Sequence, residues 1–174
     1  MSDYYYSFFF GMYPYICLTI FVLGTLIRYD REQYSWRASS SQLLADKGLK
    51  IGNVMFHIGV IFIFFGHLVG LLTPHALYTQ FITAEQKQLL AIIAGGIAGT
   101  IGFIGLTILV FRRMFVARIR ATSSTMDILV VFIFWVQITL GMITIPFSLG
   151  HHDAGIMIQL SEWAQHIVTF RSGA

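Results

Sequence analysis

Two histidines, His57 and His67, lie ten residues apart in an apolar stretch that is long enough to cross a membrane. Ionisable side chains inside a bilayer are energetically costly, and they face the interior of a helix bundle where they occur. Ten helical residues separate the two rings by about 15 Å along the axis, which is too far for both to ligate one metal ion. The separation suits two stacked haems, because neutral imidazole is a common axial ligand of haem iron. The alternative is that both histidines only form hydrogen bonds between helices.

The composition indicates an integral membrane protein. Of the 174 residues 56% are hydrophobic and 11% are charged, whereas a soluble domain has roughly a quarter charged residues to cover its surface. Four stretches reach the about 20 apolar residues that are needed to cross a hydrocarbon core of about 30 Å. They are residues 8–27, 51–72, 89–111 and 128–146. We therefore expect an all-α transmembrane helical bundle that forms a single membrane domain over residues 1–174.

The residues after the fourth stretch have a different character. Residues 147–174 mix polar and apolar side chains, and Ile156, Leu160, Trp163 and Ile167 are spaced by 4, 3 and 4 positions. This spacing predicts a short amphipathic helix that lies on the membrane surface.

The basic residues predict the orientation of the bundle. Segments 28–50 and 112–126 carry nine of the eleven Lys and Arg residues, and the other side of the membrane carries only Lys87 and Arg171. Cytoplasmic loops have an excess of basic residues, so both segments should be cytoplasmic, with the N-terminus and residues 147–174 outside. Because the basic residues flank apolar stretches and form no single patch, the net charge of +3 does not indicate nucleic acid as a partner. No basic residue precedes the first stretch, so we expect it to remain as a span and not to be a cleaved signal peptide.

Two smaller patterns predict local structure. Asp127 directly precedes the fourth stretch, where its carboxylate is expected to cap the N-terminus of the helix. Gly95-x-x-x-Gly99 in the third stretch is typical of two membrane helices that pack closely together.

Other residues that can bind metals are not expected to do so. Cys17 is the only cysteine, which excludes an intrachain disulfide and the attachment motif of a c-type haem. His151, His152 and His166 lie in a polar segment, where each is expected to be a solvated interfacial side chain, and His75 is expected to be a loop residue.

Short motifs recur in order along the whole chain, in its loops as well as in its apolar stretches. They are Tyr13-Pro14-Tyr15, Arg28-Tyr29-Asp30, Gln33-Tyr34-Ser35-Trp36-Arg37-Ala38, Phe56-His57-Ile58-Gly59, Gly66-His67, Leu72-Thr73-Pro74-His75, Arg112-Arg113, Arg118-Ile119-Arg120-Ala121-Thr122, Thr144-Ile145-Pro146-Phe147-Ser148 and Trp163-Ala164-Gln165. Together they resemble the gamma subunit, which is the haem b subunit, of the membrane-bound respiratory nitrate reductases.

This resemblance implies a function for the whole chain. Members of that family have five membrane helices and two b haems, and they oxidise quinol near the outer face of a prokaryotic cell membrane. Electrons then pass to an iron–sulfur (beta) subunit and a molybdenum catalytic (alpha) subunit on the cytoplasmic side. The chain would therefore be an electron-transfer subunit of an enzyme complex and would not itself reduce nitrate.

The resemblance also implies the haem ligands. His57 and His67 match the two axial ligands on the family's second helix, with His57 serving the cytoplasm-side haem and His67 the outer haem. The other two axial histidines of the family lie on a fifth helix. We therefore expect four of the five spans within this sequence and the partner ligands beyond Ala174.

Lys87 and three further residues are candidates for contacts with the quinol or the haems. The resemblance places Lys87 at the quinol site, where its ammonium would donate a hydrogen bond to a quinone oxygen; the alternative is a lysine that extends to the membrane interface. Gly66, beside His67, is a weaker candidate for the same site. Arg112 and Arg113 end the third stretch, where anchoring of the span is favoured over pairing with haem propionates.

Two rival functions remain open on the sequence alone. The first is the haem b subunit of another quinol-linked complex, of the sulfite- or heterodisulfide-reductase type, which the loop motifs around Trp36 and Arg120 disfavour. The second is a membrane anchor or transporter subunit that binds no cofactor.

Overall fold

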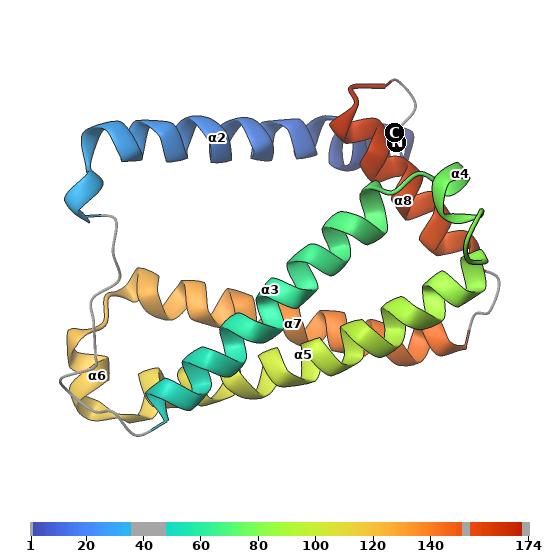
Figure 1. The fold of residues 1–174 in the computed structure, drawn as a ribbon. Coiled ribbons are helices and arrows are strands. Elements are labelled where there is room, and N and C mark those ends of the chain that lie inside the picture. The colour runs from blue at the N-terminus through green and yellow to red at the C-terminus, as the bar shows by residue number, and fades with distance from the viewer. Residues whose placement is uncertain (1, 36–47, 151–153, 172–174) are drawn as a thin grey trace.

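The computed structural model describes residues 2–35, 48–150 and 154–171, and every regular element in these ranges is a helix (Figure 1). The elements are α1 (Ser2–Tyr6), the π-helix η1 (Ser7–Met12), α2 (Tyr13–Arg31), the 3-10 helix η2 (Gln33–Ser35), α3 (Leu49–Leu72), α4 (His75–Tyr78), α5 (Ala84–Phe115), α6 (Ala117–Thr122), α7 (Thr125–Leu149) and α8 (Gly155–Val168). Within these ranges, four helical segments are long and apolar enough to cross a membrane, namely Tyr4–Arg31, Leu49–Leu72, Ala84–Phe115 and Thr125–Leu149. The expected all-α membrane bundle is thus confirmed, and each predicted span lies inside one of these segments.

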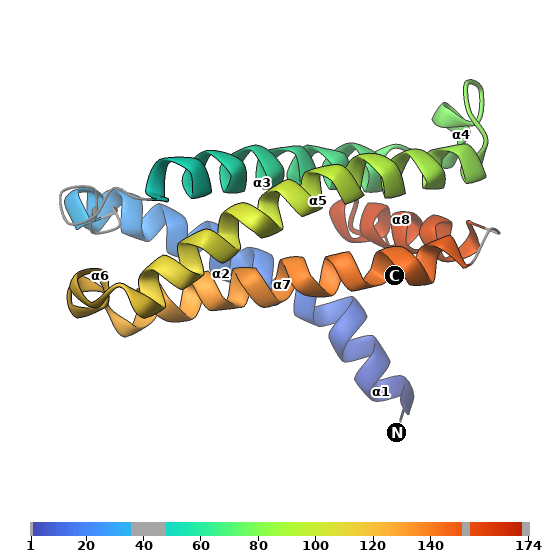
Figure 2. The same cartoon turned by 90° about the horizontal axis from the view of Figure 1, so that it is seen from below.

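The first membrane helix is bent near its start. Figure 2 shows α1 turning away from the axis of α2, and Pro14 stands in the first turn of α2. Proline has no N–H, so the carbonyl of Phe10, four residues earlier, loses its α-helical donor. The indole N–H of Trp163 donates to that carbonyl at 2.8 Å, so α8 satisfies a backbone group that Pro14 leaves open.

The centre of the bundle is a close crossing of α3 and α5 that depends on glycines. A Cβ at Gly59 would lie 2.5 Å from the Cα of Gly102 and 2.7 Å from the carbonyl oxygen of Ala98. A Cβ at Gly105 would lie 2.8 Å from the carbonyl oxygen of Gly52. The two backbones can approach this closely only because no side chain lies between them.

The predicted packing motif Gly95-x-x-x-Gly99 is therefore only half right. A Cβ at Gly99 would meet the sulfur of Met142 on α7 at 2.7 Å, but one at Gly95 would meet nothing within 4 Å. Gly95 and Gly99 are one helical turn apart, and only Gly99 faces a neighbouring helix. The backbone-to-backbone contact is made further along α5, by Gly102 and Gly105.

The structure also corrects the predicted cap of the fourth span. Ser124, not Asp127, is the N-cap of α7, and its side chain accepts a hydrogen bond from the backbone N–H of Asp127. The Asp127 carboxylate accepts in turn from the backbone N–H of Ser124 at 3.0 Å. The helix thus begins one turn earlier than predicted, because this capping box satisfies its free N–H groups.

The predicted amphipathic helix is present as α8, which lies against the end of α3. The hydroxyl of Ser161 and the side-chain amide of Gln165 donate to the carbonyl of Leu71 at 2.7 and 2.9 Å. Of the predicted apolar stripe, Ile167 is buried, whereas Ile156 and Leu160 are exposed. Figure 1 shows α4 and α8 at one end of the bundle and η2 and α6 at the other. We call the first the α8 end and the second the α6 end.

Candidate functional site

Both histidines of α3 are held in the same way. The Nδ1 atom of His57 lies 2.8 Å from the carbonyl oxygen of Asn53, and Nδ1 of His67 lies 2.8 Å from that of Ile63. A carbonyl oxygen can only accept, so Nδ1 is the donor in both hydrogen bonds, and Nε2 is the ring nitrogen that these bonds leave unused. A backbone carbonyl behind one ring nitrogen is the usual support for an imidazole whose other nitrogen binds a metal.

The two rings lie away from the α3–α5 crossing. At about 100° per residue, His57 is about 160° around the helix from Gly59, so it is on the opposite side of α3. His67 is ten residues further towards the α8 end, and both side chains are exposed. A Cβ at the adjacent Gly66 would meet nothing within 4 Å. The imidazoles are therefore open to a partner that is not part of the described protein.

The described residues contain no group of three or more His, Cys, Asp and Glu side chains that could together hold a metal ion. His57 and His67 thus stand as separate single imidazoles, about 15 Å apart along α3. Such an arrangement can supply one axial ligand at each of two positions in the membrane.

Lys87 lies at the α8 end, in the first turn of α5. Thr83 and Gln86 form the capping box that starts this helix and fixes the position of Lys87. The Lys87 Nζ atom lies 3.8 Å from the centroid of the Tyr78 ring, and it is buried with no hydrogen-bond partner among the described residues. A buried ammonium that lacks an acceptor is costly, so a ligand that brings an oxygen atom would bind here favourably.

Tyr78 was not singled out in the sequence, although it belongs to this site. It ends α4 and is only 9% exposed, and the ring of His75 packs edge-on against it at 5.1 Å. Burial raises the pKa of the Tyr78 hydroxyl above its ordinary value, and the negative charge of Glu162 raises it further. The ring that faces Lys87 is therefore neutral at physiological pH. The one feature of the sequence that could have pointed to Tyr78 is its position, as an aromatic residue in the short segment between the second and third spans.

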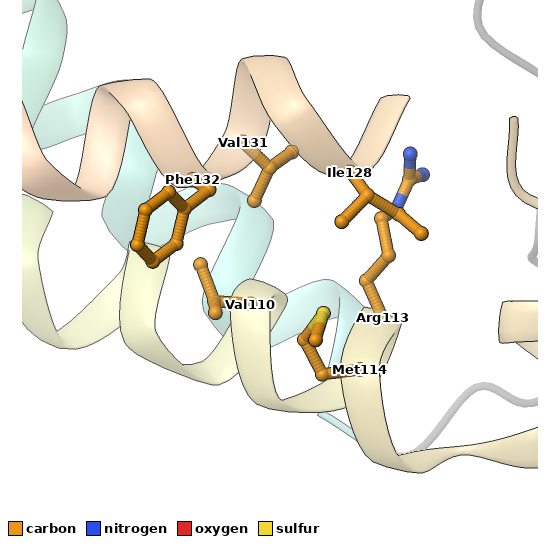
Figure 3. A pocket seen from close by; sticks show the side chains of 6 residues that line it. All are labelled: Val110, Arg113, Met114, Ile128, Val131 and Phe132. Carbon is orange, nitrogen blue, oxygen red and sulfur yellow. The ribbon is translucent and has the colours of Figure 1, made fainter. Parts of the chain in front are cut away.

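One arginine at the α6 end forms an ion pair within the protein. The guanidinium of Arg113 lies 3.7 Å from the carboxylate of Asp127, which joins α5 to α7. Figure 3 shows Arg113 at the edge of an apolar cavity of about 110 Å³, its guanidinium pointing away from Val110 and Phe132. The side chain of Arg112 is 6% exposed. Pairing of either arginine with a haem propionate stays a prediction.

Of the remaining histidines, the structure describes two. His75, which was expected in a loop, instead begins the short helix α4, next to Tyr78. His166 is half-buried on α8. His151 and His152 lie outside the described residues.

Comparison with known proteins identifies the family. A family model described as nitrate reductase gamma subunit matches residues 6–174. The respiratory nitrate reductase 2 gamma chain of Escherichia coli (strain K12) is 50% identical over 174 residues, which cover 100% of this chain and 77% of that protein. The respiratory nitrate reductase 1 gamma chain of the same strain is 47% identical over 96% of this chain and 74% of its own length. The nitrate reductase gamma chain of Bacillus subtilis (strain 168) is 36% identical over 94% of this chain and 74% of its own length. The chain therefore belongs to the nitrate reductase gamma subunit family, and the four candidate membrane helices among its described residues agree with a multi-pass membrane subunit of an oxidoreductase complex.

Proposed function

We propose that this chain is the cytochrome b subunit of a respiratory nitrate reductase. In this proposal quinol is oxidised at the α8 end, and electrons leave at the α6 end to an iron–sulfur (beta) subunit and then to a molybdenum catalytic (alpha) subunit. The observation that carries the proposal is the pair of exposed imidazoles on α3, in each of which Nδ1 is bound to a carbonyl and Nε2 has no hydrogen-bond partner among the described residues. The names of the relatives, gamma chains of respiratory nitrate reductases, support the assignment of the complex.

His57 and His67 would each hold the iron of one b haem. The exposed rings, and the open space beside Gly66, fit a flat macrocycle standing against α3. When bound, the two haems supply one-electron carriers at two depths of the membrane. The chain itself would fix the ring orientation of each histidine through the hydrogen bonds to the carbonyls of Asn53 and Ile63.

The quinol would bind between Lys87 and the outer haem ligand. Lys87 is the fourth residue of α5 and His67 is in the last two turns of α3, so both are at the α8 end. Quinol oxidation releases two electrons and two protons, and a quinol or quinone oxygen would accept the hydrogen bond that the Lys87 ammonium lacks. Gly66 would leave space for the head group beside His67.

The proposal requires the α8 end to face the outside of the cell membrane. The nine basic residues of segments 28–50 and 112–126 support this orientation, because basic loops stay in the cytoplasm. A topology reporter fused after Lys47 should report a cytoplasmic location, and one fused after Thr83 an external location. The reverse pattern would contradict both the orientation and the assignment of inner and outer haems.

Replacement of Lys87 by alanine tests the quinol site. A hydrogen bond from a charged group is worth about 1.5–3 kcal/mol, so kcat/KM for a quinol analogue should fall roughly 10- to 100-fold. The b-type band in a reduced-minus-oxidised spectrum of the assembled complex should be unchanged, since Lys87 does not ligate iron. Arg171→Ala, which removes the other basic residue outside segments 28–50 and 112–126, is the control and should leave kcat/KM unchanged.

Two results would count against the proposal in different ways. Wild-type kcat/KM in Lys87→Ala would show that Lys87 is an interfacial anchor and not part of the quinol site. Absence of any b-type band from the purified wild-type complex would instead favour a membrane anchor without a cofactor.

A further inference from the structure

We propose that Tyr78 is a positioning residue for quinol, which holds the Lys87 ammonium in place through the face of its ring. The inference rests on the proposed function, because it takes Lys87 as the residue that contacts quinol. It adds a second residue to that site, from a different element of the fold.

The contact has the geometry of a strong cation–π interaction. The Lys87 Nζ atom is 3.8 Å from the ring centroid, well inside the distance of about 6 Å at which such contacts are attractive. Nζ is buried and finds no hydrogen-bond acceptor in the described residues, so the ring face is the partner that offsets its loss of water. The strength of a cation–π contact increases when the cation is desolvated, as it is here.

Tyr78 and Lys87 are each fixed by their own backbone. The carbonyl of Tyr78 accepts hydrogen bonds from the N–H groups of Phe81 and Ile82 at 3.0 and 2.9 Å, which closes the turn after α4. The capping box of Thr83 and Gln86 then fixes the first turn of α5. These bonds set the backbone positions of Tyr78 and Lys87 before any ligand arrives, and the Tyr78 ring is held by its burial and by its contact with His75. Only the four-carbon side chain of the lysine is left to be oriented.

The Tyr78 ring orients the Lys87 side chain without occupying the N–H donors of its ammonium group. An ammonium has three N–H donors, and a ring face compensates its charge without offering an oxygen lone pair. Lys87 is thus held in one place and still lacks an acceptor, which a quinol or quinone oxygen supplies. Without the ring, the stem is free to turn towards water, and each binding event must then order it again.

The test compares Tyr78→Phe, which keeps the ring face, with Tyr78→Leu, which removes it. In the assembled complex, Tyr78→Leu should raise KM for a quinol analogue about three- to tenfold while kcat changes little, because binding is weakened and chemistry is not. Tyr78→Phe should stay within about twofold of wild type. The amplitude of the b-type band checks that each variant has assembled, and Tyr78→Met provides a second variant without a ring.

A double variant separates this inference from the proposed function. In a Lys87→Ala background, Tyr78→Leu should have no further effect on KM, since the ring then has no ammonium to hold. The inference is overturned if both ring-free variants keep wild-type KM, if Tyr78→Phe is as impaired as Tyr78→Leu, or if the two effects multiply in the double variant. If Lys87→Ala itself keeps wild-type kinetics, it is the proposed quinol site that fails.

Discussion

Replacing His57 by alanine in the assembled complex should remove the haem nearer the α6 end, and replacing His67 should remove the haem nearer the α8 end. A methyl group cannot bind iron, and the neighbours Phe56, Ile58, Gly66 and Leu68 offer no substitute ligand. Haem extracted per complex, and the b-type bands that remain, measure the loss. Under the proposed function, each variant should lose one of the two proposed haems.

The two losses should differ in function. Without the outer haem, electrons cannot leave the quinol, so quinol should reduce no haem in the gamma subunit. Without the inner haem, quinol should still reduce the outer haem, but transfer to the cytoplasmic subunits should stop. His166→Ala, which changes a half-buried histidine of α8, is the control and should keep both haems. Full haem content in either α3 variant would show that the replaced histidine is not a ligand.

Replacing Gly59 by alanine should loosen the whole bundle. The added methyl group would lie 2.5 Å from the backbone of Gly102, and backbone atoms cannot rotate away as the end of a side chain can. The axes of α3 and α5 must therefore separate, at a cost of roughly 1–3 kcal/mol for overpacking. The expected results are a lower unfolding temperature in detergent and partial loss of haem, because His57 is only two residues away on α3. Gly59→Leu should prevent assembly.

Gly70→Ala is the matched control for this change. It lies on the same helix, but its added methyl group would meet nothing within 4 Å. It carries the same change in helix propensity, which favours alanine by about 1 kcal/mol, so any difference between the two variants reports the crossing alone. Equal stability of Gly59→Ala and Gly70→Ala would contradict the close approach of α3 and α5.

The positions of the spans could be predicted from the sequence because the bilayer sets a minimum apolar length. The ends of the helices could not be predicted in this way, since a helix extends beyond its apolar stretch into the interface as far as its capping residue. Thr83 and Ser124 start α5 and α7 several residues before the apolar stretches begin. The Ser-x-x-Asp pattern at Ser124 was a readable signal, but Asp127 was interpreted as the cap itself.

The rotation of each helix about its axis was harder to predict. Lipid and neighbouring helices are equally apolar, so composition does not distinguish the face of α5 that meets α3 from the one that meets lipid. This is why Gly95 was grouped with Gly99, while Gly102 and Gly105 make the contact. The contact between Tyr78 and Lys87 depends on how the turn between α4 and α5 folds, which no periodic pattern encodes. His57 and His67 could be chosen as candidate ligands because ionisable groups are rare in such stretches.

The hydrogen bond from Trp163 to the carbonyl of Phe10 joins residues 153 positions apart. At a synthesis rate of about 5–20 residues per second, roughly 8 to 30 s pass between the appearance of Phe10 and that of Trp163 at the ribosome. Throughout this interval the backbone group that Pro14 leaves without a donor cannot use the indole of α8. Attachment of the first membrane helix to α8 is thus a late event in biogenesis, although this helix is the first to be made.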